Sequence, residues 1–123
     1  MATKPSKKYY YHISTFEGWF KVQQEGLKAS EDGYIYMYDT NEPNILAYAA
    51  ANQLFMTDYG LIRIDPAGIT GALEPDIVGE LTAKHQFRVK QKLIEKKYIQ
   101  ALGMKKVIMA KVLPYKRGYS SSD

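Results

Sequence analysis

Two histidines, His12 and His85, are the side chains best suited to acid–base chemistry near neutral pH in this chain. The chain has no cysteine, which excludes disulfides, thiolate metal ligands and cysteine nucleophiles. No serine has the glycine-flanked context of a hydrolase nucleophile. The glycine-containing segment at 68–79 lacks the Lys-Ser/Thr ending of a phosphate-binding loop. Two distant histidines without cysteine do not form a metal-binding pattern, so we expect no metal site.

Tyrosine is the second chemical feature, with 11 residues against 4 phenylalanines and 1 tryptophan. A ring with an apolar face and a polar tip suits a half-buried sheet, a stacking platform or an interface. In the segment 33–38, alternation puts Tyr34, Tyr36 and Tyr38 on one face of a strand, with an aliphatic pair on the other. The aliphatic pair marks a buried face, so the tyrosine row lines a groove, a second packing layer or solvent.

His12 stands at the end of a strand expected over residues 8–13, on the same face as Tyr10. A lone histidine is either a structural residue or a ligand-binding one. Its place directly before a helix cap keeps both interpretations open. The functional hypothesis for this region is a histidine that faces the tyrosine row.

A short helix must connect these two strands. A Ser-Thr pair supplies the N-cap of a helix expected over residues 15–25, and Gly26 is suited to end it. At helical spacing, Trp19 and Phe20 should both pack on the sheet. An Asp-Gly turn within residues 30–33 then returns the chain to the tyrosine strand.

The later elements hold this pair of strands in place. They are expected as a helix over 45–54, an ordered loop over 66–79 with a helical turn near Asp76, a helical turn that Gly103 stops, and strands over 61–65, 85–91 and 105–113. The pattern predicts an α+β fold with a split, mostly antiparallel, twisted sheet and two main helices. We expect one domain over 8–114, a flexible leader over 1–7 and a disordered tail over 115–123.

The net charge of +4 comes from lysines spread over the chain, with denser groups near both ends and around residues 84–97. These charges form either solvated faces or a surface that attracts phosphate. No stretch approaches the ~18 apolar residues of a membrane helix, and the first residues lack the apolar core of a signal peptide. We therefore expect a cytoplasmic protein with no membrane association.

The order of motifs carries a resemblance. YHIS, a helix, EGLKAS, DGYIYMY and an alanine-rich helix together resemble the ADP-ribosyltransferase-like superfamily. That superfamily includes PARP-type and diphtheria-toxin-type transferases, RNA 2′-phosphotransferases and many small bacterial and phage domains. The resemblance covers roughly residues 9–99 and rests on short motifs. It implies NAD as the substrate, bound in a cleft between the first two strands and the strand at 85–91.

The resemblance also implies roles for individual residues. His12 would contact the nicotinamide ribose of NAD, and Tyr36, or alternatively Tyr34, would stack on nicotinamide. Gln86 falls where the superfamily often has a glutamate that positions the reacting ribose. A glutamine can hydrogen-bond a ribose hydroxyl but is not a carboxylate base. Glu80 is the alternative for this third position.

Two further residues complete the nucleotide site that the resemblance implies. Ile13 follows the histidine, and Arg88 lies on the same strand as Gln86. Arg88 would pair either with a ligand phosphate or with a surface carboxylate.

Two functions from different classes follow. The first is a domain that binds NAD or an ADP-ribose-type nucleotide, either as an active ADP-ribosyltransferase or as a degenerate relative. The alternative is a non-enzymatic binding module, such as a phage or mobile-element accessory protein that sequesters a nucleotide signal or docks on a host protein. Its interface would be the tyrosine face and the loop at 66–79. Nucleic-acid binding ranks last, because the positive charge is not clustered on one element.

Overall fold

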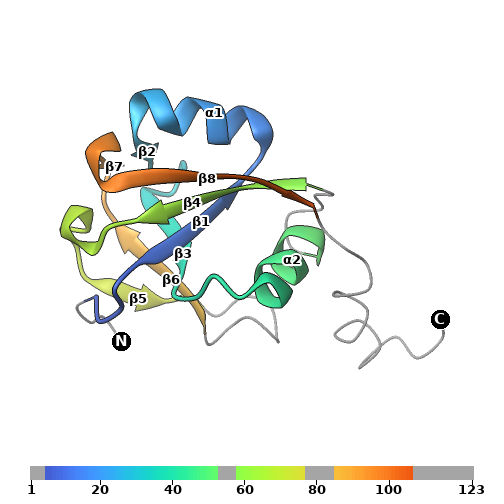
Figure 1. Cartoon of the computed structure of the whole chain (residues 1–123). Coiled ribbons are helices and arrows are strands. Elements are labelled where there is room, and N and C mark those ends of the chain that lie inside the picture. The colour runs from blue at the N-terminus through green and yellow to red at the C-terminus, as the bar shows by residue number, and fades with distance from the viewer. Residues whose placement is uncertain (1–4, 53–57, 77–84, 107–123) are drawn as a thin grey trace.

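The computed structural model describes residues 5–52, 58–76 and 85–106. They form an α+β fold with a six-stranded sheet in the order β5-β6-β3-β1-β4-β8 and a small β2-β7 ladder (Figure 1). All described strand pairs are antiparallel. The predicted α+β class with two helices and a mostly antiparallel sheet is confirmed. The strands are β1 (Tyr10–Ser14), β2 (Leu27–Lys28), β3 (Tyr34–Tyr38), β4 (Asp58–Ile64), β5 (Leu73–Pro75), β6 (Gln86–Lys90), β7 (Leu93–Ile94) and β8 (Ile99–Lys106).

Two α-helices in the described residues cover the sheet. Helix α1 (Phe16–Glu25) follows β1, and α2 (Pro43–Asn52) follows β3 (Figure 1). Two short 3-10 turns, η1 (Pro66–Gly68) and η3 (Lys96–Tyr98), connect strands. No helix within the described ranges is long and apolar enough to cross a bilayer.

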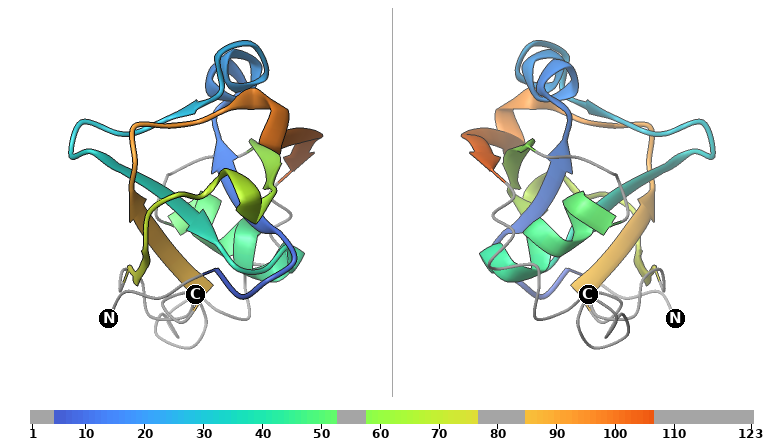
Figure 2. Two further views of the ribbon diagram at one scale, coloured as in Figure 1. Left: turned by 90° about the vertical axis from the view of Figure 1, so that its left-hand side faces the viewer. Right: turned by 90° about the vertical axis from the view of Figure 1, so that its right-hand side faces the viewer.

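The sheet is weakly joined at its centre. β1 pairs with β4 along its whole length, whereas β1 and β3 share a single register pair, Tyr11 with Tyr38. In Figure 2 the half of the sheet that holds β3 and β6 turns away from the half that holds β1 and β4. The two halves therefore meet at one narrow junction between β1 and β3.

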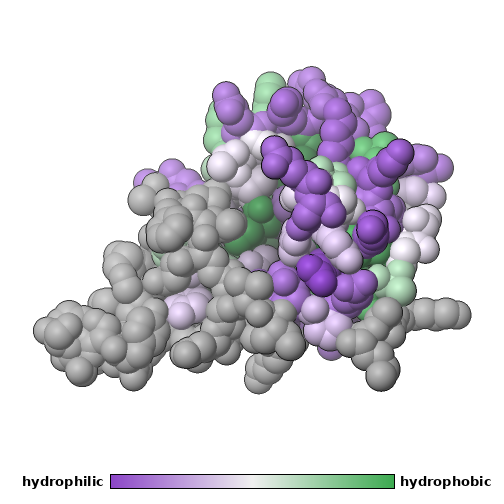
Figure 3. All heavy atoms as spheres, turned by 180° about the vertical axis from the view of Figure 1, so that it is seen from behind, coloured by the Kyte–Doolittle hydropathy of each residue, from purple (hydrophilic) through white to green (hydrophobic). Residues whose placement is uncertain are grey.

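Two hydrophobic cores lie on the two faces of this sheet. The larger core includes Tyr10, Met37 and Ile62, together with Val22 of α1, and we call its side the α1 face. The second core includes Leu46, Ala49 and Ala50 of α2, and we call its side the α2 face; its strand members are Ile13, Tyr38, Tyr59 and Leu61. Seen from behind, the described surface is mostly hydrophilic, with a recessed hydrophobic area near its centre (Figure 3).

Helix α1 has the ends that its sequence predicts. The Thr15 side chain accepts a hydrogen bond from the Gly18 amide at 3.1 Å, and Gly26 ends the helix with a φ of 85°. Trp19 packs on Gly60 so closely that a Cβ atom at Gly60 would lie 2.4 Å from the Trp19 Cβ. The prediction for Phe20 is wrong, because its side chain is 54% exposed. Trp19 fills the space over β4, and the next residue of the helix points outward.

The later elements differ from the predictions in three ways. The loop expected over 66–79 contains η1 and the short strand β5. Gly103 does not end a helical turn but lies inside β8, at a bulge where the register shifts opposite Leu61, and its φ is 101°. β8 runs from Ile99 to Lys106, ahead of the strand expected over 105–113, most of which lies outside the described residues. The leader before residue 5 and the tail expected over 115–123 also lie outside them.

Candidate functional site

The three strands that carry the predicted site residues are neighbours in the sheet. His12 lies on β1, Tyr36 on β3 and Gln86 on β6, and the sheet order places β3 between the other two. Residues 74 positions apart in sequence are thus brought close together by strand pairing. The side chains, however, divide between the two faces of the sheet.

His12 does not face the tyrosine row. It pairs with Ile62, a fully buried member of the α1-face core. Tyr38 pairs instead with Tyr11, and both pack on the α2-face core. Paired residues share a face, so the tyrosines of β3 point to the side opposite His12. The alternation of side chains shows which residues of one strand share a face. Only the pairing register shows which face of the next strand lies on the same side of the sheet.

His12 instead holds the junction between the two halves of the sheet. Its Nδ1 atom lies 2.8 Å from the backbone oxygen of Tyr36. A carbonyl oxygen only accepts, so Nδ1 carries the proton and donates it. Burial lowers the pKa of His12 below its usual 6.5, although this hydrogen bond acts in the opposite direction. The imidazole is therefore neutral at pH 7, with its lone pair on Nε2.

Polar and aromatic side chains gather on the opposite face, across β3, β6 and β5. Tyr36 pairs with Arg88, which pairs with Glu74. Tyr38 pairs with Gln86, and the Asp76 amide donates to the Gln86 carbonyl at 2.9 Å. We call this surface the Tyr36–Arg88 face; its members are Tyr34, Tyr36, Tyr38, Glu74, Asp76, Gln86 and Arg88.

Arg88 is the cation at the centre of this face. Its Nε donates to Glu74 Oε1 at 3.2 Å, and its Cζ lies 4.2 Å from the centre of the Tyr34 ring. A hydrogen bond with the Tyr36 hydroxyl, and then that with Glu74, raise the pKa of Arg88. The guanidinium is thus held between two tyrosines and a carboxylate, an arrangement suited to planar stacking and anion binding.

Tyr36 is anchored at its other side by Asp32. The Tyr36 hydroxyl donates to Asp32 Oδ2, and the rings of Tyr34 and Tyr36 lie 6.4 Å apart with an angle of 47° between them. The same hydrogen bond lowers the pKa of Asp32 and raises that of Tyr36. Because Asp32 belongs to the Asp-Gly turn, this turn also fixes the orientation of the Tyr36 ring.

Asp76 is the residue that the sequence did not single out for this face. It was expected near a helical turn, but it follows β5 directly and continues that strand's pairing with β6. Burial raises the pKa of Asp76, while the nearby Arg88 lowers it. A carboxylate therefore lies on the strand beside Gln86, whereas the resemblance implied a carboxylate at the Gln86 position itself or at Glu80. β5 has only three residues and a proline, so no periodic pattern marked it.

The other predicted site residues have mixed placements. The side chain of Ile13 is buried in the α2-face core, while Tyr34 lies on the Tyr36–Arg88 face. Glu80, the alternative third residue, lies outside the described residues. His85 Nδ1 lies 2.8 Å from Asp39 Oδ1 at the end of β3, forming a polar pair that joins β3 and β6.

No protein-family model matches the chain, and no curated protein sequence is significantly similar to it. The described part of the chain also has no group of three or more His, Cys, Asp or Glu side chains that could hold a metal ion. The function proposed below therefore rests on the geometry of the site and on the motif resemblance.

Proposed function

We propose that the Tyr36–Arg88 face binds NAD or an ADP-ribose-type nucleotide, in an ADP-ribosyltransferase-like fold. The observation that carries this proposal is the pair of cross-strand rows on one face, Tyr36–Arg88–Glu74 and Tyr38–Gln86–Asp76. Together they offer an aromatic surface, a cation, an amide and carboxylates, which are the groups that a nucleotide's base, phosphate and sugar require.

The order of elements supports the proposed fold. The YHIS motif lies on β1, α1 follows it, and the DGYIYMY motif forms a turn and β3 before α2. β6 then begins at Gln86 and pairs beside β3. The narrow β1–β3 junction supports the split sheet that was predicted from the sequence.

Each part of the ligand has a matching group. The base or nicotinamide ring would stack on Tyr36 or Tyr34, and ribose hydroxyls would hydrogen-bond Asp76 and Gln86. Arg88 would bind a phosphate by exchanging its contact with Glu74, which is half-exposed and 3.2 Å away. His12 would act indirectly, because its hydrogen bond to the Tyr36 carbonyl positions β3.

Gln86 and Asp76 favour two different versions of this function. Gln86 in place of a carboxylate favours a protein that binds a nucleotide without cleaving it. Asp76 favours glycosidic cleavage, because a dissociative reaction develops positive charge on the ribose and a nearby carboxylate stabilises that charge.

Calorimetric titration with ADP-ribose and NAD tests the binding. Arg88→Gln should weaken ADP-ribose binding about tenfold, since a charge-assisted contact with phosphate is worth about 1.4 kcal/mol. Lys97→Gln, which removes an equal charge from η3, should change affinity less than about twofold. Absence of heat at millimolar ligand, or equal losses in the two variants, would contradict the proposal.

Product analysis separates the two versions. Nicotinamide released from NAD over hours by the unmodified chain, but not by Asp76→Asn, would establish glycosidic cleavage. If ADP-ribose binds and no nicotinamide appears, the protein binds the nucleotide without cleaving it.

A further inference from the structure

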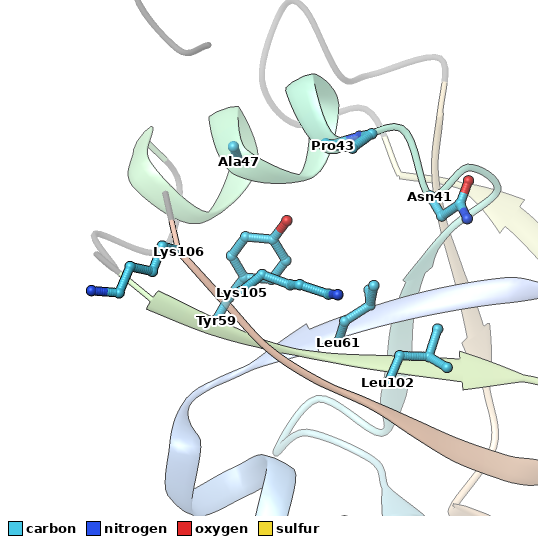
Figure 4. Close-up of a pocket in the computed structure, with 8 residues that line it drawn as sticks. All are labelled: Asn41, Pro43, Ala47, Tyr59, Leu61, Leu102, Lys105 and Lys106. Atoms are coloured by element: carbon cyan, nitrogen blue, oxygen red, sulfur yellow. The ribbon is translucent and has the colours of Figure 1, made fainter. Parts of the chain in front are cut away.

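A cavity lies between α2 and the strands β4 and β8 (Figure 4). Its volume is about 520 Å³. No residue that lines it belongs to the nucleotide face proposed above, so the inference drawn here is independent of that function. The lining residues are Asn41, Pro43, Ala47, Tyr59, Leu61, Leu102, Lys105 and Lys106.

The inner wall of the cavity is apolar and carries one hydroxyl. Ala47, Leu61 and Leu102 supply aliphatic surface from three different elements. Tyr59 is 3% exposed, and its hydroxyl has no hydrogen-bond partner among the described residues. Figure 4 shows this hydroxyl directed into the space below α2. Burial raises the pKa of Tyr59, so the phenol stays protonated and can donate a hydrogen bond.

Two lysines of β8 are also among the residues that line the cavity. Lys105 pairs across the strands with Tyr59 and therefore shares its face, whereas Lys106 pairs with Asp58. In Figure 4 the Lys105 side chain extends toward Leu61, and the Lys106 side chain extends in the opposite direction. The lining includes no carboxylate, and within the described ranges Lys105 forms no ion pair.

We infer that this cavity binds a small aromatic carboxylate. The volume lies within the roughly 300–1,000 Å³ range of small-molecule sites. The ring of the ligand would pack on Leu61, Leu102 and Ala47. Its carboxylate would take a hydrogen bond from the Tyr59 hydroxyl and the charge of Lys105. One inward-facing ammonium group fits a single negative charge better than a doubly charged phosphate.

The probe is 1-naphthoate, titrated into the nitrogen-labelled full chain and followed by amide NMR. Shifts should concentrate at Ala47, Tyr59, Leu61 and Leu102. The neutral analogue 1-naphthamide should bind at least about fivefold more weakly, because one partly exposed charge contact is worth about 1 kcal/mol. 1-Naphthyl phosphate tests whether the site prefers a doubly charged group, and tighter binding of the phosphate would overturn the carboxylate assignment.

Two matched lysine variants test the charge. Lys105→Gln should weaken 1-naphthoate about fivefold, and Lys106→Gln less than about twofold, although both remove one charge from adjacent positions. Both lysines are exposed, so both variants should fold. Tyr59→Phe should weaken binding a further few-fold by removing the donor while keeping the ring.

Further outcomes would also overturn the inference. They are no amide shifts at millimolar 1-naphthoate, equal effects of the two lysine variants, or shifts confined to residues outside the cavity. Equal binding of 1-naphthamide and 1-naphthoate would overturn it as well, because the cavity would then be a general apolar site without charge selection.

Discussion

At the residue scale, the His12 imidazole joins the two halves of the sheet beside the one backbone pair, Tyr11 with Tyr38. His12 donates to the Tyr36 carbonyl at 2.8 Å, where β1 and β3 have otherwise stopped pairing. Since burial lowers its pKa, the neutral ring is the form that suits the fold. This makes the β1–β3 junction sensitive to acid.

The free energy of unfolding should therefore fall as the pH drops below about 6.5. The unfolded chain takes up a proton on His12 at its ordinary pKa, whereas the folded chain takes it up only at lower pH. The contribution of neutral His12 to the free energy of unfolding is fully present above the ordinary pKa of histidine. It is lost as the pH falls from that value to the lowered pKa of His12 in the folded chain. Urea unfolding at several pH values measures this directly.

His12→Gln supplies the comparison, because its amide can still donate to the carbonyl but does not titrate. Its stability should depend less on pH over the same window, while His85→Gln should retain the loss seen in the unmodified chain. Parallel pH profiles for His12→Gln and the unmodified chain would show that His12 is not the source.

The Tyr36–Asp32 hydrogen bond gives a second test at this scale. Tyr36→Phe removes the hydroxyl that lowers the pKa of Asp32, so the pKa of Asp32 should rise toward its usual value. Carboxyl carbon NMR across an acid titration measures the change. Tyr34→Phe keeps the Tyr36 hydroxyl and should leave the pKa of Asp32 low; an equal rise in both variants would contradict the assignment.

At the scale of elements, α1 is seated by one close contact. Trp19 occupies the space where a side chain at position 60 would lie, with only 2.4 Å between Trp19 Cβ and a Cβ built on Gly60. This contact explains why Trp19 packs inward while Phe20 is exposed. The helix sequence alone predicted that both residues are buried, because the helical pattern fits with either Trp19 or Phe20 directed toward the sheet.

Gly60→Ala should destabilise the fold by about 2–3 kcal/mol, because the backbone of β4 or α1 must shift. Gly103→Ala offers a contrast: its φ of 101° is strained for alanine, but no atom lies within 4 Å of the added Cβ. The free energy of unfolding of Gly103→Ala should therefore fall by only about 1 kcal/mol. Thermal unfolding of both variants measures the two losses of stability. A larger loss of stability for Gly103→Ala than for Gly60→Ala would contradict the close packing of α1 on β4.

Phe20→Ser should change the free energy of unfolding by less than about 0.5 kcal/mol, as expected for an exposed site. Trp19→Ala, one residue earlier, should cost about 2–4 kcal/mol because a partly buried ring that packs against the core is removed. Urea denaturation distinguishes them. A loss above about 2 kcal/mol for Phe20→Ser would mean that α1 packs in the orientation first expected from its sequence.

Elements with strong local signals were predictable from the sequence. Thr15 and Gly26 mark the ends of α1, and the Asp-Gly turn marks the start of β3. β5 was missed because three residues next to a proline carry no periodicity. Gly103 was predicted to end a helical turn, but a glycine with positive φ is equally suited to a bulge within a β-strand, which is where it lies.

At the scale of the whole molecule, strand pairing decides what the site contains. Local alternation put Tyr36 and Tyr38 on one face correctly and left a groove, a second packing layer or solvent open for that face. Tyr38 lies in a second packing layer, because it is buried in the α2-face core. The face of His12 relative to the tyrosines depends on a long-range register that no local pattern contains. The same pairing brought Asp76 beside Gln86, a contact that the sequence did not suggest.

Binding of an ADP-ribose-type nucleotide at the Tyr36–Arg88 face is the function proposed for this protein. An amide NMR titration of the nitrogen-labelled chain with ADP-ribose tests it most directly. We expect saturable shifts at β3, at β6 and at Asp76, with little change around Tyr59 in the separate cavity. No shift at millimolar ADP-ribose, or shifts confined to elements other than β3, β5 and β6, would contradict the claim.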